Sequence, residues 1–111
     1  MKIITRLEEA ILIAILRLED NAYGVTINNH VSESSQKNYS LGALYFALDQ
    51  LLRKGYVKKT IKRFYHEKGG RSPTYYILTE EGRKALREVR SYQKSLWEGI
   101  PEMTFDVKKT K

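Results

Sequence analysis

Residues 40–65 of the chain read SLGALYFALDQLLRKGYVKKTIKRFY, and the pattern changes at Gly55. Before this glycine, leucines recur at steps of three and four residues, which indicates one face of a helix, and Ser40 is a favourable N-cap. After it, aromatic and β-branched residues predominate, as in a strand. Glycine is also a common helix stop. The segment therefore predicts a helix from Ser40 to Lys54 and a strand that follows it directly.

Two further helices are predicted before Ser40. Residues 5–8, TRLE, have the form of a capping box, so a first helix starts at position 5 and ends near Asp20. Asn21 is the predicted cap of a second helix that starts at about Tyr23. The polar stretch 32–38 is predicted to be a loop, because its side chains compete with the backbone for hydrogen bonds.

A hairpin and a last helix are predicted after Gly55. Residues 74–78, TYYIL, form the second strand, and Gly69-Gly70 lies between the strands as a turn signal. Thr79 caps the final helix, which has acidic residues in its first turn. Pro101 ends this helix, and the residues that follow it are predicted to be a polar, loosely ordered tail.

This order of elements predicts the fold class. We expect an α+β, mostly α chain, a winged helix-turn-helix of three helices and a two-stranded wing, followed by a C-terminal dimerisation helix. The predicted divisions are 1–79 for the winged-helix DNA-binding domain, 80–100 for the dimerisation helix and 101–111 for the polar tail. In a winged helix the third helix enters the DNA major groove, and the hairpin contacts the adjacent backbone or minor groove. The order therefore favours a sequence-specific DNA-binding protein.

Composition and size restrict the possible functions. A chain of 111 residues with 41% hydrophobic and 30% charged residues has the composition of one globular domain. It contains no cysteine, which excludes disulfides and thiolate metal sites. The longest apolar run, residues 10–16, is far too short to span a bilayer, and the N-terminus lacks a signal-peptide pattern. We therefore expect a cytoplasmic protein without a membrane partner.

The net charge of +7 is concentrated in one segment. Residues 53–71 contain eight lysines and arginines and a single acid, Glu67, so this segment alone accounts for the whole net charge. A local basic field on an otherwise neutral domain is typical of a surface that binds the phosphate backbone, although an acidic partner could use it too. Taken with the order of elements, it predicts double-stranded DNA as the partner.

The candidate DNA contacts follow from the faces of the third helix. At about 100° per residue, Leu41 and Tyr45 fall on the core arc with the other leucines, and Ala43, Phe46 and Ala47 on the opposite arc. The side chains of the opposite arc are small near the N-terminal end of the helix. A glutamine that can pair with adenine follows, and the last turn carries cations suited to phosphate contacts. An arginine at the hairpin tip can reach a groove. The full set of candidates is Ser40, Ala43, Tyr45, Phe46, Gln50, Arg53, Lys54, Lys62, Arg63, Gly70 and Arg71.

Two helices are predicted to contact a second copy of the chain. Residues 10–16 are apolar around the whole circumference, so one face of the first helix would pack in the core and another against a partner. The last helix carries apolar residues at alternating steps of four and three, as in a coiled-coil seam. We therefore expect a homodimer. The candidate dimer contacts are Ile11, Ile15, Ala85, Val89, Tyr92 and Leu96.

No catalytic or metal-binding pattern is found in the sequence. The chain has two histidines, His30 and His66, no Walker loop, no nucleophile elbow and no carboxylate pair spaced for acid–base chemistry. We therefore expect a binding protein without a cofactor, not an enzyme.

Two other binding functions fit the same pattern. In an RNA-binding protein, Phe64, Tyr65, Tyr75 and Tyr76 would stack on unpaired bases. In a protein-interaction adaptor, the winged helix would dock on an acidic partner, and binding would lack the steep salt dependence of phosphate contacts. RNA ranks below duplex DNA, because aromatic residues on the strands of a small domain more often pack against its core.

Five motifs in register resemble the PadR family of bacterial transcriptional regulators. They cover roughly residues 8–90 and consist of Tyr23-Gly24, Leu41 to Leu48, Lys54 to Val57, Gly69 to Arg71, and Tyr75 to Gly82. The resemblance implies a winged-helix dimer that binds operator DNA and represses transcription, with the C-terminal helix packed across the two-fold axis. Ala43 and Phe46 stand where the family often has threonine and proline, so the base preference is expected to differ.

The resemblance also implies a ligand. Ligands of this family are often aromatic and lie near the dimer interface, where some members stack them on a tryptophan. Trp97, the single tryptophan of the chain, is therefore the candidate ligand contact. Ordinary packing of a large apolar side chain in the dimer seam is the alternative.

Overall fold

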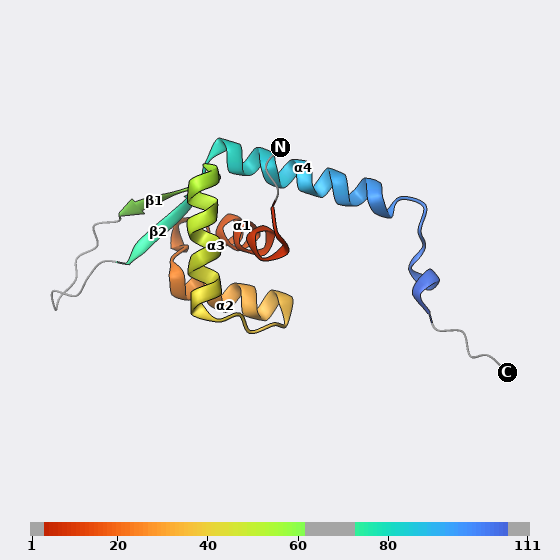
Figure 1. Cartoon of the computed structure of the whole chain (residues 1–111), viewed down its shortest axis with the longest axis horizontal. Helices are drawn as coiled ribbons and strands as arrows, with labels where there is room; N and C mark the ends of the chain where they lie inside the picture. Colours follow the sequence, from red (N-terminus) through yellow and green to blue (C-terminus); the bar gives the residue numbers. More distant parts are fainter. Residues whose placement is uncertain (1–3, 62–72, 107–111) are drawn as a thin grey trace.

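The computed structural model of the chain describes residues 4–61 and 73–106 (Figure 1). The predicted order of three helices, a two-stranded hairpin and a last helix is confirmed. The elements are α1 (Arg6–Leu18), α2 (Gly24–Ser35), α3 (Leu41–Lys54), β1 (Val57–Ile61), β2 (Thr74–Leu78) and α4 (Glu80–Trp97), with short 3-10 helices η1 (Glu19–Asn21) and η2 (Glu102–Phe105). No helix in this described part of the chain is long and apolar enough to cross a bilayer.

Helix α1 begins as the sequence predicts. The Glu8 N–H donates to Thr5 Oγ1 at 3.1 Å, and the Thr5 N–H donates back to Glu8 Oε1 at 2.9 Å, which completes the capping box. The helix ends at Leu18, two residues before the predicted end, because Glu19 leaves the helical conformation, with φ of 53° and ψ of −117°. The chain then passes through η1 into α2.

Helix α2 differs from the prediction at both ends. Its N-cap is Tyr23, and Asn21 contributes only a backbone carbonyl, which accepts a hydrogen bond of 2.6 Å from the Thr26 hydroxyl. The same hydroxyl oxygen accepts from the Tyr23 N–H at 3.0 Å. The helix continues to Ser35 through residues predicted to form a loop. Ser35 Oγ donates to the carbonyl of Val31 at 2.6 Å, so the serine side chain bonds within the helix instead of ending it.

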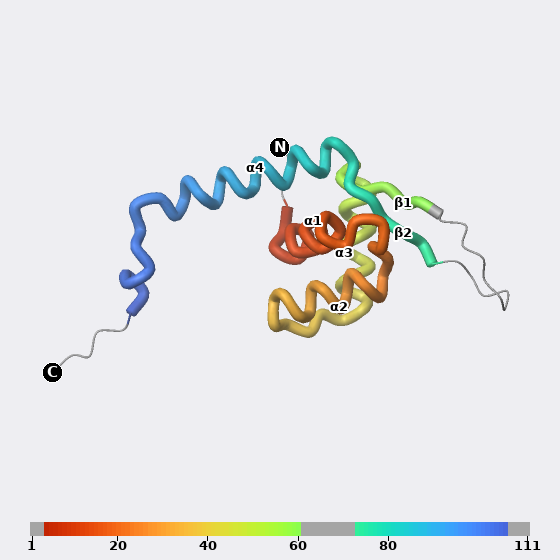
Figure 2. Tube along the Cα trace, turned by 180° about the vertical axis from the view of Figure 1, so that it is seen from behind, coloured from red at the N-terminus to blue at the C-terminus, as the bar shows by residue number. Residues whose placement is uncertain are grey.

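The core is built around α1, which packs against α2, α3, β2 and α4 (Figures 1 and 2). This position explains why α1 is apolar on every side without a second chain. Ile11 and Ile15 are 0% and 2% exposed within the single chain. The prediction that these two residues contact a partner subunit is therefore wrong. The largest fully buried side chains are Ile11, Leu12, Ile27, Val31, Leu44, Leu48 and Leu51.

The hairpin is held to the helices by its second strand. Strands β1 and β2 are antiparallel, with Val57 opposite Leu78 and Lys59 opposite Tyr76. The Tyr76 N–H donates to the carbonyl of Ala22 at 2.8 Å, which joins β2 to the connection between α1 and α2. Tyr75 and Tyr76 are both buried. The base of the wing is therefore part of the folded core.

Helix α4 starts on the core and then leaves it. Thr79 Oγ1 accepts from the Gly82 N–H at 3.0 Å and donates to the carbonyl of Gly55 at 2.6 Å, so the first turn is bonded to the end of α3. Figures 1 and 2 show the rest of α4 extending beyond the three-helix core. The outer half of α4 therefore lies outside the domain core.

The segment after α4 is more ordered than predicted. The helix ends at Trp97, before Pro101, and Gly99 has φ of 82° in the turn that follows. Residues 102–105 then form η2. The ring of Phe105 lies 5.5 Å from the ring of Trp97, centroid to centroid, so an apolar contact holds this turn beside the end of the helix.

Candidate nucleic-acid interface

Helix α3 has one face in the core and one face outward. Its buried residues are Leu44, Ala47, Leu48 and Leu51. The opposite side, which we call the α3 outer face, consists of Gly42, Tyr45, Phe46, Asp49 and Arg53, all of them exposed. Phe46 is 66% exposed and lies near the middle of this face. Because all five residues are exposed, the face is accessible to a partner as large as duplex DNA.

The buried and exposed sides of α3 differ from the predicted ones by a rotation of roughly 70° about the helix axis. Leu41, predicted in the core, is 59% exposed, and Ala47, predicted outward, is buried. Tyr45 is exposed, although the helical wheel placed it on the core side. Ala43 and Gln50, both candidate DNA contacts, are half-buried at one edge. The reason is that Leu44, Leu48 and Leu51 fill the contact with α1, so a leucine in the first turn extends past the edge of the core.

Ser40 has a defined structural role at the start of α3. Its Oγ accepts a hydrogen bond of 3.0 Å from the Ala43 N–H, which satisfies one of the free N–H groups of the first turn. The residue itself is exposed. The N-terminal end of α3, with the positive end of its dipole, is thus capped and faces solvent.

Two adjacent cations at the end of α3 differ in their surroundings. Arg53 Nε donates to Asp49 Oδ2 at 2.9 Å, and its side chain is 73% exposed. Lys54 Nζ instead lies 2.6 Å from the buried carboxylate of Glu8, and its side chain is only 20% exposed. Lys54 therefore joins α3 to α1, which differs from the phosphate contact predicted for it, whereas Arg53 projects from the α3 outer face.

Tyr45 is positioned by a glycine on α2. A Cβ at Gly24 would overlap the phenol oxygen of Tyr45, so only glycine lets this side chain lie across the start of α2. Tyr76 lines the same small pocket as Tyr45. Burial raises the pKa of Tyr76, with smaller contributions from Tyr45 and Asp49. Gly24, Asp49 and Leu41 were absent from the predicted contacts. The i, i+4 spacing of Asp49 and Arg53 was the one local signal for any of them.

The hairpin candidates divide between described and undescribed positions. Lys62, Arg63, Gly70 and Arg71 lie outside the described residues, so their predicted DNA contacts stay predictions. The described part of β1 carries Lys58 and Lys59, both exposed. Lys58, opposite Ile77, and Lys59, opposite Tyr76, lie on opposite faces of the hairpin, so only one of them can continue the positive surface of Arg53 onto the wing.

The predicted dimer contacts on α4 also divide into two groups. Ala85 is buried in the core of the single chain, so its predicted intersubunit contact is wrong. Val89 is half-buried, whereas Tyr92 and Leu96 are 60% and 56% exposed. These three line a groove of about 880 Å³ between α4 and the start of α1, which we call the α4 groove. Its full lining is Ile4, Arg6, Glu9, Val89, Tyr92, Gln93, Leu96, Trp97 and Ile100.

A hydrogen bond joins two of the residues that line the α4 groove. Gln93 Nε2 donates to Glu9 Oε1 at 3.0 Å and so links the outer half of α4 to α1. Trp97, the candidate ligand contact, lines the far end of the groove and is half exposed. The groove is thus apolar along α4 and polar where it meets α1.

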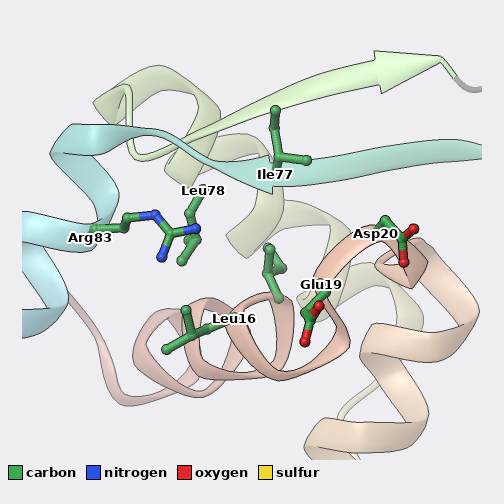
Figure 3. Close-up of a pocket in the computed structure, with 7 residues that line it drawn as sticks. Leu16, Glu19, Asp20, Ile77, Leu78 and Arg83 are labelled. Carbon is green, nitrogen blue, oxygen red and sulfur yellow. The ribbon is translucent and has the colours of Figure 1, made fainter.

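A separate pocket of about 580 Å³ lies among the end of α1, β2 and the start of α4 (Figure 3). Figure 3 shows Arg83 approaching it from α4, with Leu78 behind, and Glu19 and Asp20 at the other end. None of the predicted DNA contacts lines this pocket. Within residues 4–61 and 73–106, no group of three histidine, aspartate or glutamate side chains is arranged to hold a metal ion.

The fold and the α3 outer face define a winged helix-turn-helix protein. The chain belongs to the PadR-like family of transcriptional regulators, because the sequence model of that family matches residues 11–88. This confirms the predicted resemblance and the class of regulator. No curated protein matches the chain.

Solved structures with a similar fold cover nearly the whole chain. RosR from H. salinarum is 25% identical, with a TM-score of 0.68 over 91% of this chain and 84% of that one. A PadR family transcription regulator from Clostridium difficile R20291 is 24% identical, with a TM-score of 0.70 over 90% and 96%. A PadR-like regulator from Bacillus cereus is 21% identical, with a TM-score of 0.72 over 91% and 93%.

Proposed function

We propose that this chain is a homodimeric repressor that binds operator DNA sequence-specifically and releases it on binding an aromatic ligand. The observation that carries the proposal is the α3 outer face: a capped, solvent-facing helix in a chain of the PadR-like family. A transcriptional regulator of this kind binds and releases operator DNA, so the proposal includes no catalytic step and no cofactor.

Helix α3 is the element that enters the major groove in this proposal. Gly42 and Phe46 face outward near its start, and Arg53 projects from its last turn. One of the two exposed lysines of β1, Lys58 and Lys59, which lie on opposite faces of the hairpin, continues the positive surface onto the wing in this proposal. A helix with a cation in its last turn can place its first turns against base edges while the cation contacts a phosphate.

The α4 groove supports the homodimer. Tyr92, Leu96 and Trp97 are large apolar side chains that no described residue of the chain buries. They lie on a helix that extends away from the core, where a second α4 can pack along the same stripe. A two-fold pair of this kind would set the two copies of α3 about one helical turn of DNA apart, roughly 34–36 Å.

Trp97 supports the ligand part of the proposal. Its ring is half exposed at the end of the α4 groove and already contacts one aromatic ring, that of Phe105. A planar aromatic ligand could take the same kind of contact. Titration of planar aromatics against the fluorescence of Trp97 tests this, and the absence of any quenching or shift over a diverse set would remove the ligand from the proposal.

The structure argues against the RNA-binding alternative. Tyr75 and Tyr76, two of its four stacking residues, are buried and cannot receive a splayed base. The other two, Phe64 and Tyr65, lie outside the described residues. The adaptor alternative predicts binding to an acidic protein without the salt dependence of phosphate contacts. No observation favours either alternative over duplex DNA.

Fluorescence anisotropy of labelled duplex DNA at several salt concentrations tests the proposal. Each phosphate neutralised contributes about −0.9 to the slope of log K against log salt, so several contacts give a steep slope. Single-stranded RNA serves as the competitor and should displace the duplex poorly. A flat salt dependence, or preferential binding of the RNA, would contradict the proposed function.

A further inference from the structure

The α3 outer face is unusually apolar for a surface that should read bases. Tyr45 and Phe46 on this face, and Leu41 beside it, are all exposed large hydrophobic residues on the first two turns of the helix. None of them is needed in the core, whose share of α3 is filled by Leu44, Leu48 and Leu51. Exposed apolar side chains clustered on a binding surface indicate a partner with apolar groups of its own.

The polar side chains near these residues are largely engaged within the chain. The Ser40 hydroxyl accepts from the helix backbone, and the Asp49 carboxylate accepts from Arg53. Few side chains on the first turns of α3 are therefore left to form hydrogen bonds with base edges. Gln50, half-buried one turn after Phe46, is the remaining amide on this side of the helix.

Gly42 leaves an open space directly before Phe46 on the same face. A Cβ at this position would have only one atom within 4 Å, Ser40 Oγ at 3.9 Å. The backbone there is ordinary helix, so neither the fold nor the conformation requires glycine. Glycine in a helix is less favourable than alanine, and nothing among the described residues fills the place of a side chain here. A close approach of another molecule to the helix backbone would account for the glycine.

We propose that Phe46 selects thymine by packing on its C5-methyl group, with Gly42 giving the base pair room to approach α3. In the major groove the thymine methyl is the apolar group that distinguishes one base pair from the others. Phe46 lies about one turn after Gly42 and about two turns before the phosphate-facing Arg53, so an apolar contact and a phosphate contact lie on one face. The inference rests on the proposed function.

The test compares thymine with uracil, which lacks only the C5-methyl group. A binding site is first selected from random duplex DNA, and each thymine is then replaced singly by uracil in anisotropy titrations. We expect binding to weaken about fourfold at a few positions of each half-site, the effect of one buried methyl group, and to stay unchanged elsewhere. Phe46→Ala should bind the thymine and uracil sites equally.

Two further variants separate methyl recognition from general binding. Arg53→Ala is the matched control, because it should weaken binding to thymine and uracil sites by the same factor. Gly42→Ala should fold and still bind at least tenfold more weakly, because its methyl group occupies the open space. Tight binding that ignores every uracil substitution, or a Phe46→Ala variant that keeps the thymine preference, would overturn this inference alone. Failure to bind any duplex would overturn the proposed function as well.

Discussion

Helix α3 and the outer half of α4 both expose large apolar side chains, but they hold them differently. Phe46 lies on a helix anchored by four buried residues and is followed on the same face by a charged pair. Tyr92, Leu96 and Trp97 form a longer apolar stripe on a helix that has left the core. A short apolar contact on a rigid helix suits the recognition of another molecule, whereas a long stripe on a projecting helix suits pairing with its own copy.

The largest expected effect comes from charging the α4 stripe. Tyr92→Glu with Leu96→Glu should convert the dimer to a monomer and weaken DNA binding by about 100-fold, because a dimer gains from binding two half-sites at once. Sedimentation velocity and anisotropy measure the two changes. Arg90→Gln is the control: it changes an exposed residue of the same helix outside the apolar stripe, and this variant should stay dimeric. A double variant that remains dimeric at equal concentration would contradict the assignment of this stripe.

The base of α4 should be the position most sensitive to a single methyl group. A Cβ at Gly82 would overlap the carbonyl oxygen of Tyr56, a backbone atom that cannot rotate away. We expect Gly82→Ala to lower the free energy of unfolding by about 2 kcal/mol. Chemical denaturation followed by circular dichroism measures it. An unchanged midpoint would mean that α4 is not fixed to the turn after α3.

Arg53 and Lys54 are neighbours with opposite expected phenotypes. Lys54→Ala leaves the buried carboxylate of Glu8 without this partner and should cost about 2 kcal/mol of stability, with the salt dependence of DNA binding unchanged. Arg53→Ala should leave stability within about 0.5 kcal/mol and reduce the salt slope by about 1. If the two phenotypes were exchanged, the separation of structural from phosphate-facing cations would be wrong.

Replacing Asp49 should have a smaller effect and should strengthen DNA binding. Asp49→Asn removes a negative charge from the α3 outer face and frees Arg53 from its ion pair. We expect the affinity for duplex DNA to rise about threefold at low salt and the difference to fade as salt is added. Anisotropy at two salt concentrations measures it. Weaker binding by this variant would show that Arg53 must be held by Asp49 in order to contact phosphate.

The smallest effect is expected at Gly42. Alanine is favoured over glycine in a helix, and the space around Gly42 is open. Gly42→Ala should therefore raise the free energy of unfolding by about 0.5 kcal/mol, the opposite sign to Gly82→Ala. A clear loss of stability would show that the space before Phe46 is used by the chain itself.

Local signals in the sequence predicted the elements well. The caps at Thr5, Ser40 and Thr79 are where they were expected, and α3 has the predicted bounds. Long-range relations could not be predicted in this way. The partner of Lys54 is 46 residues away, and the burial of α1 on several sides follows from elements that surround it only in the folded chain. Both were therefore misassigned to external partners.

The faces of α3 show a different limit. The periodicity identified the helix, but its five leucines are spread so widely around the helix that the direction of the core-facing side could not be fixed until the contact with α1 was known. The rotation moved Leu41 and Tyr45 outward and Ala47 inward. Phe46 and Arg53 stayed exposed because they lie near the middle of the outer face, where a rotation of less than one residue step changes little.

The mass of the complex on a selected operator duplex tests the central claim most directly. If α3 reads DNA and α4 pairs two copies, sedimentation equilibrium on a duplex with an inverted repeat should give two chains per DNA. The half-sites should lie one helical turn apart. A complex that saturates at one chain per duplex would contradict the account, as would equal binding to a duplex that carries a single half-site.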